Sequence, residues 1–301
     1  MDQIFSGQLL FSALVLGSLY MVASLGLNLV YGTLRLLNVA HGDLAMLGAY
    51  TAFWCFTLLG LSPLLSLPLA AGLCALAAWL VHAGLLTRGP LAARAFDGEV
   101  LQRLEANSLL IFVGLSVILQ NVAALAFTGS PRAYRYLDGV IEFAGVSMTG
   151  HRLAALAIAA VIGLAALAIL HFSRYGLAIK AMIESSMAAE VVGIDVRRFR
   201  LGALMTGFAL AGVAGGLISM SEQISPFMGF PVTIASFIVI ILGGLGNLRG
   251  GMAAAFMLAF VQVYGVTLTS SSYASVLLYG VFVGALLLRP EGLLARRVAS
   301  R

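Results

Sequence analysis

Apolar runs of about 20 residues recur along the chain and alternate with short polar segments. A helix of about 20 apolar residues crosses the hydrocarbon core of a bilayer, so this pattern predicts a polytopic α-helical integral membrane protein, all-α in fold class. We expect a single transmembrane domain over residues 1–301 with about 8–10 transmembrane helices. The favoured spans are 8–30, 44–60, 64–86, 108–127, 153–172, 201–220, 232–248, 252–268 and 273–288.

Polar residues interrupt one of these apolar stretches. Arg35, Asn38, His41 and Asp43 fall in the segment 31–50, where the surrounding sequence is apolar. Polar groups at membrane depth must be satisfied by protein or must line a cavity, so we expect a broken or re-entrant segment. Two interpretations stay open: the polar side chains border a translocation path, or they only cap and join the broken helix.

The composition excludes an ordinary soluble domain. Of the residues, 61% are hydrophobic and 10% are charged, whereas soluble domains carry roughly 25% charged residues. The net charge of +5 does not indicate nucleic-acid binding, because the basic residues gather in loops and in the tail after residue 288. Short basic loops stay in the cytoplasm, which predicts a cytoplasmic central loop and an external N-terminus.

The longest charged run is residues 174–200, with hydrophobic sequence on both sides. Within it, small residues from 181 to 192 predict one helix that ends at Gly193, since glycine commonly follows the last helical turn. A short amphipathic helix in a cytoplasmic loop offers a surface to a partner. An ordinary loop helix has the same pattern, so both interpretations stand at this point.

Sequence patterns of enzymes do not stand out. The chain has no GxxxxGK[ST] phosphate-binding loop, no Rossmann fingerprint and no GxSxG motif, and its histidines lack metal-ligand spacing. We therefore expect a protein that is not an enzyme, without catalytic residues, metal site or cofactor. Transport against a gradient would need an ion or an ATP-hydrolysing partner, and the few ionisable groups within the spans favour the partner.

The positions of the glycines lead to two further predictions, one about helix packing and one about an internal repeat. The pairs Gly212 with Gly216 and Gly280 with Gly284 form GxxxG patterns, which permit close helix packing. The glycine-interrupted segments 38–42 and 247–251 each precede an apolar helix. Paired broken segments are typical of transporters with internal repeats, so we expect a repeat that relates these two segments.

Three groups of motifs resemble one family. They are GLNLVYG at 26–32 with the LNVAHGD that follows, ESSMAAEVVGIDV at 184–196 with AGVAGGL at 211–217, and GGLGNLRGGM at 243–252 with LRPEGL at 288–293. In this order and spacing, from residue 7 to 294, the chain resembles the LivH-type permease of branched-chain amino acid ABC importers.

The resemblance implies a multi-pass subunit of the bacterial inner membrane. Its implied partners are a LivM-type second permease, two cytoplasmic ABC ATPase subunits and a periplasmic amino acid-binding protein. The implied solutes are branched-chain or other hydrophobic amino acids. Urea or short amides, an ion-coupled secondary amino acid transporter and a non-transporting scaffold are the alternatives. The implied ATPase-coupling residues, within 174–200, are Glu184, Ala188, Ala189, Gly193 and Arg197, and the implied path residues are Asn38, His41, Asp43, Gly244, Gly246 and Asn247.

Overall fold

The computed structural model describes residues 6–86, 98–143, 145–289, 292 and 294. The helices are α1 Gly7–Leu34, α2 His41–Leu59, α3 Pro63–Val81 with the π-helical turn His82–Leu86, α4 Gly98–Phe127, α5 Gly150–Phe172, α6 Arg174–Glu184, α7 Ser186–Val191, α8 Val196–Ile218, α9 Gly229–Gly243, α10 Leu248–Leu268, the 3₁₀ turn Ser271–Tyr273 and α11 Ala274–Leu288. Most of the predicted basic tail lies outside the described residues.

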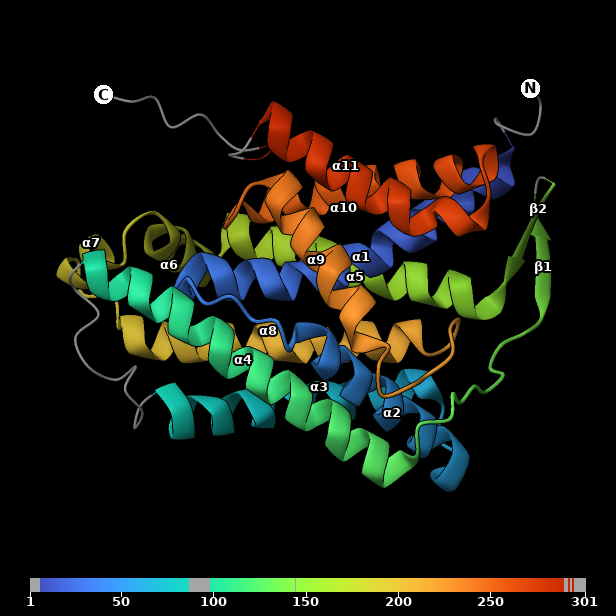
Figure 1. Cartoon of the computed structure of the whole chain (residues 1–301), viewed down its shortest axis with the longest axis horizontal. Coiled ribbons are helices and arrows are strands. Elements are labelled where there is room, and N and C mark those ends of the chain that lie inside the picture. The colour runs from blue at the N-terminus through green and yellow to red at the C-terminus, as the bar shows by residue number, and fades with distance from the viewer. Residues whose placement is uncertain (1–5, 87–97, 144, 290–291, 293, 295–301) are drawn as a thin grey trace.

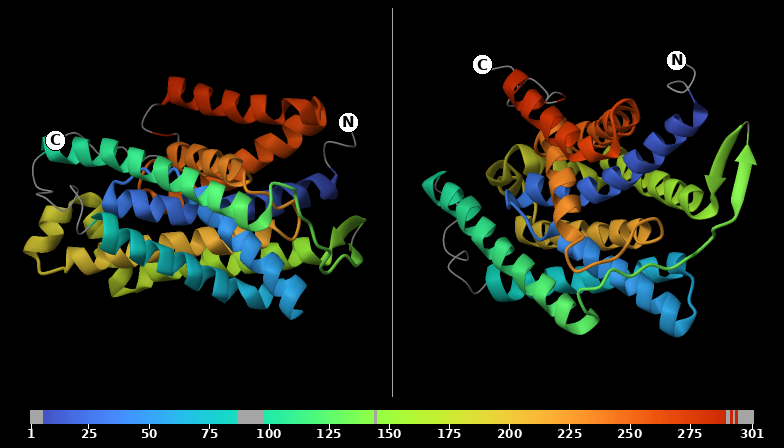
Figure 2. Two further views of the ribbon diagram at one scale, coloured as in Figure 1. Left: turned by 60° about the horizontal axis from the view of Figure 1, so that its bottom comes forward. Right: turned by 45° about the vertical axis from the view of Figure 1, so that its right-hand side comes forward.

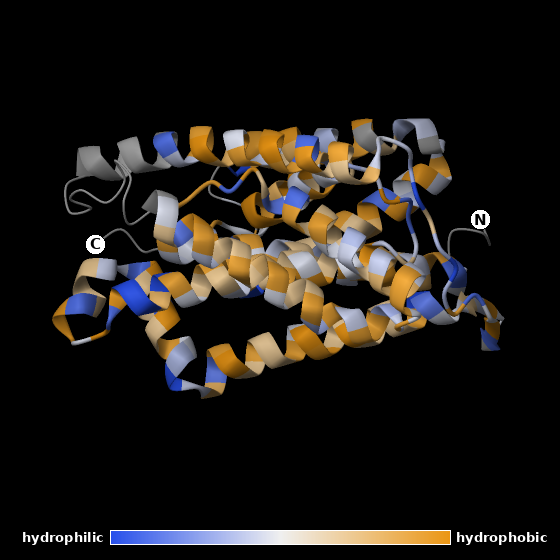
Figure 3. Cartoon of the chain, turned by 90° about the horizontal axis from the view of Figure 1, so that it is seen from below, coloured by the Kyte–Doolittle hydropathy of each residue, from blue (hydrophilic) through white to orange (hydrophobic). Residues whose placement is uncertain are grey.

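The predicted polytopic, all-α membrane fold is confirmed. Among the described residues, seven helices are long and apolar enough to cross a membrane, and two shorter apolar helices, Gly229–Gly243 and Val276–Leu288, accompany them. Figure 3 shows hydrophobic residues along the lengths of the helices, with hydrophilic residues mostly towards the two ends of the molecule.

The first helix, α1, runs between two ends of the molecule, which are defined by what each end of α1 contacts (Figure 1). At the start of α1, the side chain of Gln8 exchanges hydrogen bonds of 2.9 and 3.0 Å with the backbone of Ser147. After the last turn of α1, Arg35 donates to the carbonyl oxygen of Ile183 in α6. We call these the hairpin end and the α6/α7 end.

The hairpin end holds a small sheet that the sequence reasoning missed. No secondary structure was expected between the spans 108–127 and 153–172, but β1 Val140–Phe143 pairs with β2 Val146–Thr149 in an antiparallel hairpin. The physical reason is local: β-branched and aromatic residues occupy β1, and Gly145 adopts a φ of 77° in the connection. Such residues favour strands, and a glycine reaches this φ without strain.

Helices α1, α2 and α8 form the buried centre of the bundle. In the most apolar window of each, 61–67% of the residues are buried. Glycines let these helices approach closely, because an added Cβ on Gly26 or Gly207 would collide with the opposite backbone. Gly48 and Gly215 do the same where α2 crosses α8. Close backbone contact therefore holds these three helices together at the centre.

The bundle contains two halves of opposite direction, which Figures 1 and 2 show in three views. Helix α1 runs from the hairpin end to the α6/α7 end; residues 35–40 then turn back, and α2 begins at mid-depth. Helix α8 runs the opposite way; residues 219–228 turn back, and α9 begins at mid-depth beside α2. Helix α3 packs on α8 as α10 packs on α1.

This inverted repeat differs in its pairing from the one expected. The segment 38–42 corresponds to the start of α9 near Gly229, and not to the segment 247–251. The latter opens α10, which corresponds to α3 in the first half. The sequence echo was therefore wrong about the partner, because two turns with similar glycine content serve different places in the fold.

Candidate functional site

The starts of α2 and α9 meet in the middle of the bundle. Gly42 and Gly229 touch through their backbones, since a Cβ on either would collide with the opposite helix. Thr233 joins the two: its Oγ1 accepts a hydrogen bond of 2.8 Å from the Gly42 N–H and donates one of 3.1 Å to the Val39 carbonyl. We call this the mid-depth junction.

The junction brings three predicted path residues together. Asn38 and His41 are completely buried, and Asp43 is only 1% exposed. His41 Nε2 lies 2.7 Å from the Ala23 carbonyl in the middle third of α1, so this nitrogen is the donor. Asp43 Oδ1 accepts a hydrogen bond of 3.0 Å from Gln120 Nε2 on α4.

Asp43 is placed to stabilise both half-helices. It lies in the first turn of α2, and its Oδ1 is in contact with Gly229 at the start of α9, where no side chain caps the helix. Helix N-termini carry a partial positive charge, so one carboxylate serves two of them. Asp43 therefore acts on both N-termini through its charge and position, while its Oδ1 hydrogen bond comes from Gln120 and no described side chain caps either helix.

Asn38 has no such structural use. Neither its Nδ2 nor its Oδ1 has a hydrogen-bond partner among the described residues, and the same holds for His41 Nδ1 and Ser236 Oγ. A buried polar group without a partner costs free energy and calls for an explanation beyond stability. The junction thus has polar atoms that could hold a passing solute or change partners as the helices move.

The other predicted path residues lie elsewhere. Gly246 sits at the α6/α7 end, next to Gly32 and Ile183. Asn28 of α1 bridges this turn, accepting a 2.9 Å hydrogen bond from the Gly246 N–H and donating one of 3.0 Å to the Asn247 carbonyl. The turn, with Gly244 at a φ of 88° and Gly246 at 80°, is a structural connection at the end of the bundle.

The charged central loop folds into two helices where one was expected. Ser185 is extended, with a φ of −157°, and its Oγ caps α7 by accepting from the Ala188 N–H at 3.2 Å. Serine is a strong N-cap, so it starts a new helix and does not continue the old one. Gly193, with a φ of 87°, ends α7 as predicted.

The loop presents a face different from the one expected. Ala189 is 1% exposed and packs on Met182 and Val196, so it points into the protein. Glu184, Ala188, Gly193 and Arg197 are exposed. Three exposed apolar side chains in and just after α7 form what we call the α7 tip: Met187 (59% exposed), Val191 (83%) and Val192 (75%). The spacing of residues 182, 189 and 196 by sevens was the signal that could have shown the inward face.

The glycine pairs differ in their surroundings. A Cβ on Gly212 would meet Cys74 and the Ala70 carbonyl of α3, and one on Gly216 would meet Leu67. By contrast, a Cβ on Gly280 or Gly284 would meet no described atom within 4 Å. The first pair packs helices within this chain, while the second lies on an open face of α11.

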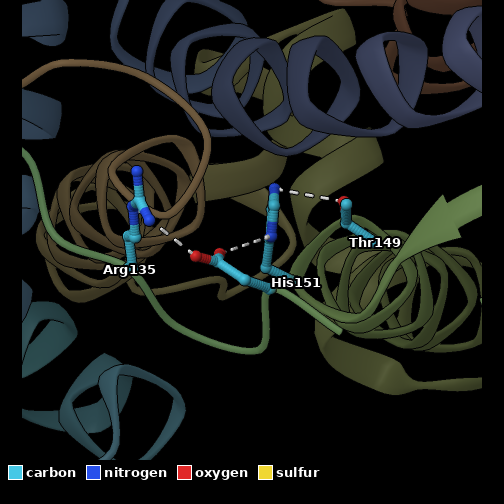
Figure 4. A network of polar contacts seen from close by, with 4 residues as sticks. Arg135, Thr149 and His151 are labelled. Atoms are coloured by element: carbon cyan, nitrogen blue, oxygen red, sulfur yellow. Dashed lines mark hydrogen bonds and ion pairs between the residues drawn. The ribbon is translucent and has the colours of Figure 1, made fainter. Parts of the chain in front are cut away.

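At the hairpin end, the loop 219–228 before α9 is hydrogen-bonded to the segment that follows α4. Arg132 and Ile224 exchange backbone hydrogen bonds of 2.8 and 2.7 Å. Tyr134 shares a 2.8 Å hydrogen bond with Ser219, and burial raises the pKa of Tyr134 to about 12, so it stays neutral. Figure 4 shows Arg135 and His151 turned towards the Asp138 carboxylate, at 3.9 Å each. At that distance, with Asp138 half exposed, these ion pairs contribute little.

Sequence reasoning missed Thr233, Gln120 and Gly229. Pro231 could have placed the start of α9 earlier, because proline is favoured in the first helical turn. No local signal links Gln120 to Asp43, since their contact depends on the tertiary fold.

Inverted halves, broken helices at mid-depth and a buried polar junction are typical of membrane transport proteins. The chain belongs to the family described as branched-chain amino acid transport system, permease component, whose model matches residues 9–286.

The chain is also similar to named permease proteins. The chain is 29% identical over 300 residues to the high-affinity branched-chain amino acid transport system permease protein BraD of Pseudomonas aeruginosa, covering 96% of this chain and 95% of that one. It is 28% identical over 306 residues to the permease LivH of Escherichia coli, with the same coverage. It is also 28% identical over 291 residues to LivM of that organism, covering 92% of this chain and 68% of LivM. No solved structure matches the chain.

Proposed function

We propose that this chain is the transmembrane permease subunit of an ABC importer for branched-chain or other hydrophobic amino acids. The observation that carries the proposal is the α7 tip, an exposed apolar projection at a charged end of a protein whose sequence contains no phosphate-binding loop. The family match over residues 9–286 supports the same class. Separate ATPase chains hydrolyse the ATP.

The α6/α7 end faces the cytoplasm, because the central loop is rich in arginine and lysine. There the α7 tip inserts into a groove of an ATPase subunit, while exposed Glu184 and Arg197 form polar contacts at the rim. Ala189 does not touch the ATPase. It packs α7 against Met182 of α6 and Val196 of α8, so a displacement of the α7 tip would also displace α8.

The loop also touches the inner ends of both halves. Ile183 packs against Gly32 at the end of α1 and against Gly246 in the turn before α10. Movement of α6 therefore reaches both halves of the repeat at once. Closure of the two ATPases would rock the halves about the mid-depth junction, a rigid-body motion of the kind that gives alternating access.

The solute passes at the mid-depth junction. The unpartnered amide of Asn38 can bind either charged end of an amino acid, because it has both hydrogen-bond donors and an acceptor. A periplasmic binding protein delivers the solute at the hairpin end, and a second permease of the LivM type completes the passage. The assembly lies in the bacterial inner membrane.

Uptake by proteoliposomes tests the proposal. The complete assembly should take up leucine when ATP is supplied, and removal of the ATPase should abolish uptake. Val191→Asp should abolish both uptake and co-purification of the ATPase, because it puts a charge on the apolar tip. Glu190→Gln, a neighbouring exposed change, is the matched control and should have little effect. Full uptake without the ATPase would refute the proposal.

A self-sufficient ion-coupled carrier is the second candidate, favoured by the burial of His41 and Asp43 at mid-depth. Leucine uptake by the purified single chain, collapsed by an ionophore, would support it. Uptake of urea or acetamide in place of leucine by the complete assembly would leave the ABC class standing and change only the solute.

A further inference from the structure

Helix α4 has the least protein around it of the seven candidate spans. Only 17% of its apolar window in Asn107–Phe127 is buried, against 67% for α1. Its inner face is attached by a ring contact of Phe112 with Phe208 and by the hydrogen bond from Gln120 to Asp43. Its other face runs along the outside of the bundle (Figures 1 and 2).

An exposed amide lies on that outer face, within the membrane. Asn121 precedes the end of α4 by about 9 Å of helix, which places it inside a hydrocarbon core of about 30 Å. Its neighbour Gln120 reaches the mid-depth junction, which confirms the depth. Its one hydrogen bond to a described residue runs from Nδ2 back to the Val117 carbonyl of its own helix, at 2.8 Å.

Lipid cannot satisfy such a side chain. Acyl chains offer no hydrogen-bond partner, and asparagine side chains in membranes typically bond across to another helix. Around Asn121, at helical spacing, lie Gly114, Val117 and Leu125, all exposed. A Cβ on Gly114 would meet no described atom within 4 Å, so another helix can approach closely there. We call these four residues the α4 face.

We propose that the α4 face is the contact surface for a second permease chain, and that Asn121 forms a hydrogen bond across this contact. The inference rests on the proposed function, in which two permeases are paired. The occupant is another membrane-spanning permease because only protein at this depth supplies a polar group for the amide. Gln120 and Asp43 lie directly behind the α4 face, so the contact would lie beside the mid-depth junction.

Oxygen accessibility of a nitroxide label tests this contact. A label at Val117→Cys, which is 53% exposed on the α4 face and leaves Asn121 in place, should collide readily with dissolved oxygen when the chain is alone in liposomes. Its collision rate should fall by about tenfold when the second permease and the ATPases are present. A label at Leu164→Cys on α5, which is 67% exposed, is the matched control and should stay accessible in both samples. Cys55 and Cys74 are buried, and the unsubstituted chain gives the background.

Equal accessibility at position 117 in both samples would overturn the proposal. Low accessibility already in the lone chain would mean that a second copy of this chain is the occupant, which also overturns it. The label is read in the assembled complex without solute, so a failure of leucine uptake would count against the proposed function alone.

Substitution gives a second, independent measurement. Asn121→Leu should lower the amount of second permease that co-purifies by about threefold to tenfold, and Asn121→Gln should retain it. The position is exposed in the single chain, so neither change should impair its folding. Undiminished co-purification of Asn121→Leu would contradict the hydrogen bond across the contact.

Discussion

The two halves of the repeat share a geometry but differ in chemistry. In each half a long helix is followed by a segment that turns back, and a second helix then begins at mid-depth. In the first half Asn38, His41 and Asp43 lie at that beginning, whereas in the second half Met228, Gly229 and Phe230 do. The break itself therefore needs no ionisable group.

This difference distinguishes the residues that form the fold from the residues that are candidates for function. Glycine backbone contacts, such as that of Gly42 with Gly229, allow the two broken helices to meet. We call these glycine backbone contacts and the helices that they join the frame. The polar residues of the first half are not needed to form it. One of them, Asp43, contacts Gly229 at the start of the apolar half and accepts a hydrogen bond from Gln120, while the Asn38 side chain has no hydrogen-bond partner among the described residues. Buried polar groups without structural use at a membrane's centre are functional candidates.

The frame should be the part most sensitive to substitution. Gly42→Ala puts a methyl group into the backbone of α9, where neither helix can yield cheaply. We expect loss of folded protein, measured as monodisperse material after extraction into mild detergent. Gly114→Ala, at an open position of α4, is the matched control and should be tolerated. Normal yield and normal uptake for Gly42→Ala would show that the two breaks do not touch.

The link between the halves should be next in effect. Thr233→Val removes the hydroxyl that serves both Gly42 and Val39, and leaves a buried N–H and a part-buried carbonyl unpaired. We expect a loss of about 1–3 kcal/mol in the free energy of unfolding. Thr233→Ser keeps the hydroxyl and should recover most of it. A valine variant as stable as the serine variant would argue against the link.

Removal of an unpaired polar group should act in the opposite direction on stability. Asn38→Leu replaces a buried amide without partners by an apolar side chain of similar size, so stability should be unchanged or rise by about 1 kcal/mol. ATP-driven leucine uptake should nevertheless fall strongly. A variant that loses stability and keeps uptake would assign Asn38 to the frame.

The smallest effect is expected at the open glycines of α11. Gly280→Ala meets no described atom of this chain, so the free energy of unfolding of the isolated permease should change by less than about 0.5 kcal/mol. Gly212→Ala, which faces Cys74 and Ala70, should cost clearly more. Equal effects would mean that α11 packs more tightly than its position indicates.

The sequence predicted the spans and the first break well, because both depend on local patterns. Apolar runs located the helices, and polar residues between 35 and 43 marked the break. The second break was missed because residues 221–231, between the expected spans 201–220 and 232–248, resemble an ordinary loop. Its depth follows only from the contact of Gly229 with Gly42, which are far apart in the chain and whose pairing no local pattern reveals.

The coupling loop shows the same limit at a smaller scale. Its position between the halves and its end at Gly193 followed from charge and glycine. The division at Ser185 was missed because serine is acceptable in a helix interior and its capping role depends on the local backbone. As a result Ala189 was expected to face outwards, although it packs inside the loop.

The most direct test of the division between frame and chemistry is ATP-driven leucine uptake by Asp43→Asn, measured together with its unfolding temperature. Asparagine keeps an oxygen for Gln120 and removes the charge. We expect uptake to fall by at least about tenfold, with the unfolding temperature lowered by only a few degrees. Unchanged uptake with a strongly lowered unfolding temperature would show that Asp43 is only a cap, and would contradict the assignment of the solute path to the mid-depth junction.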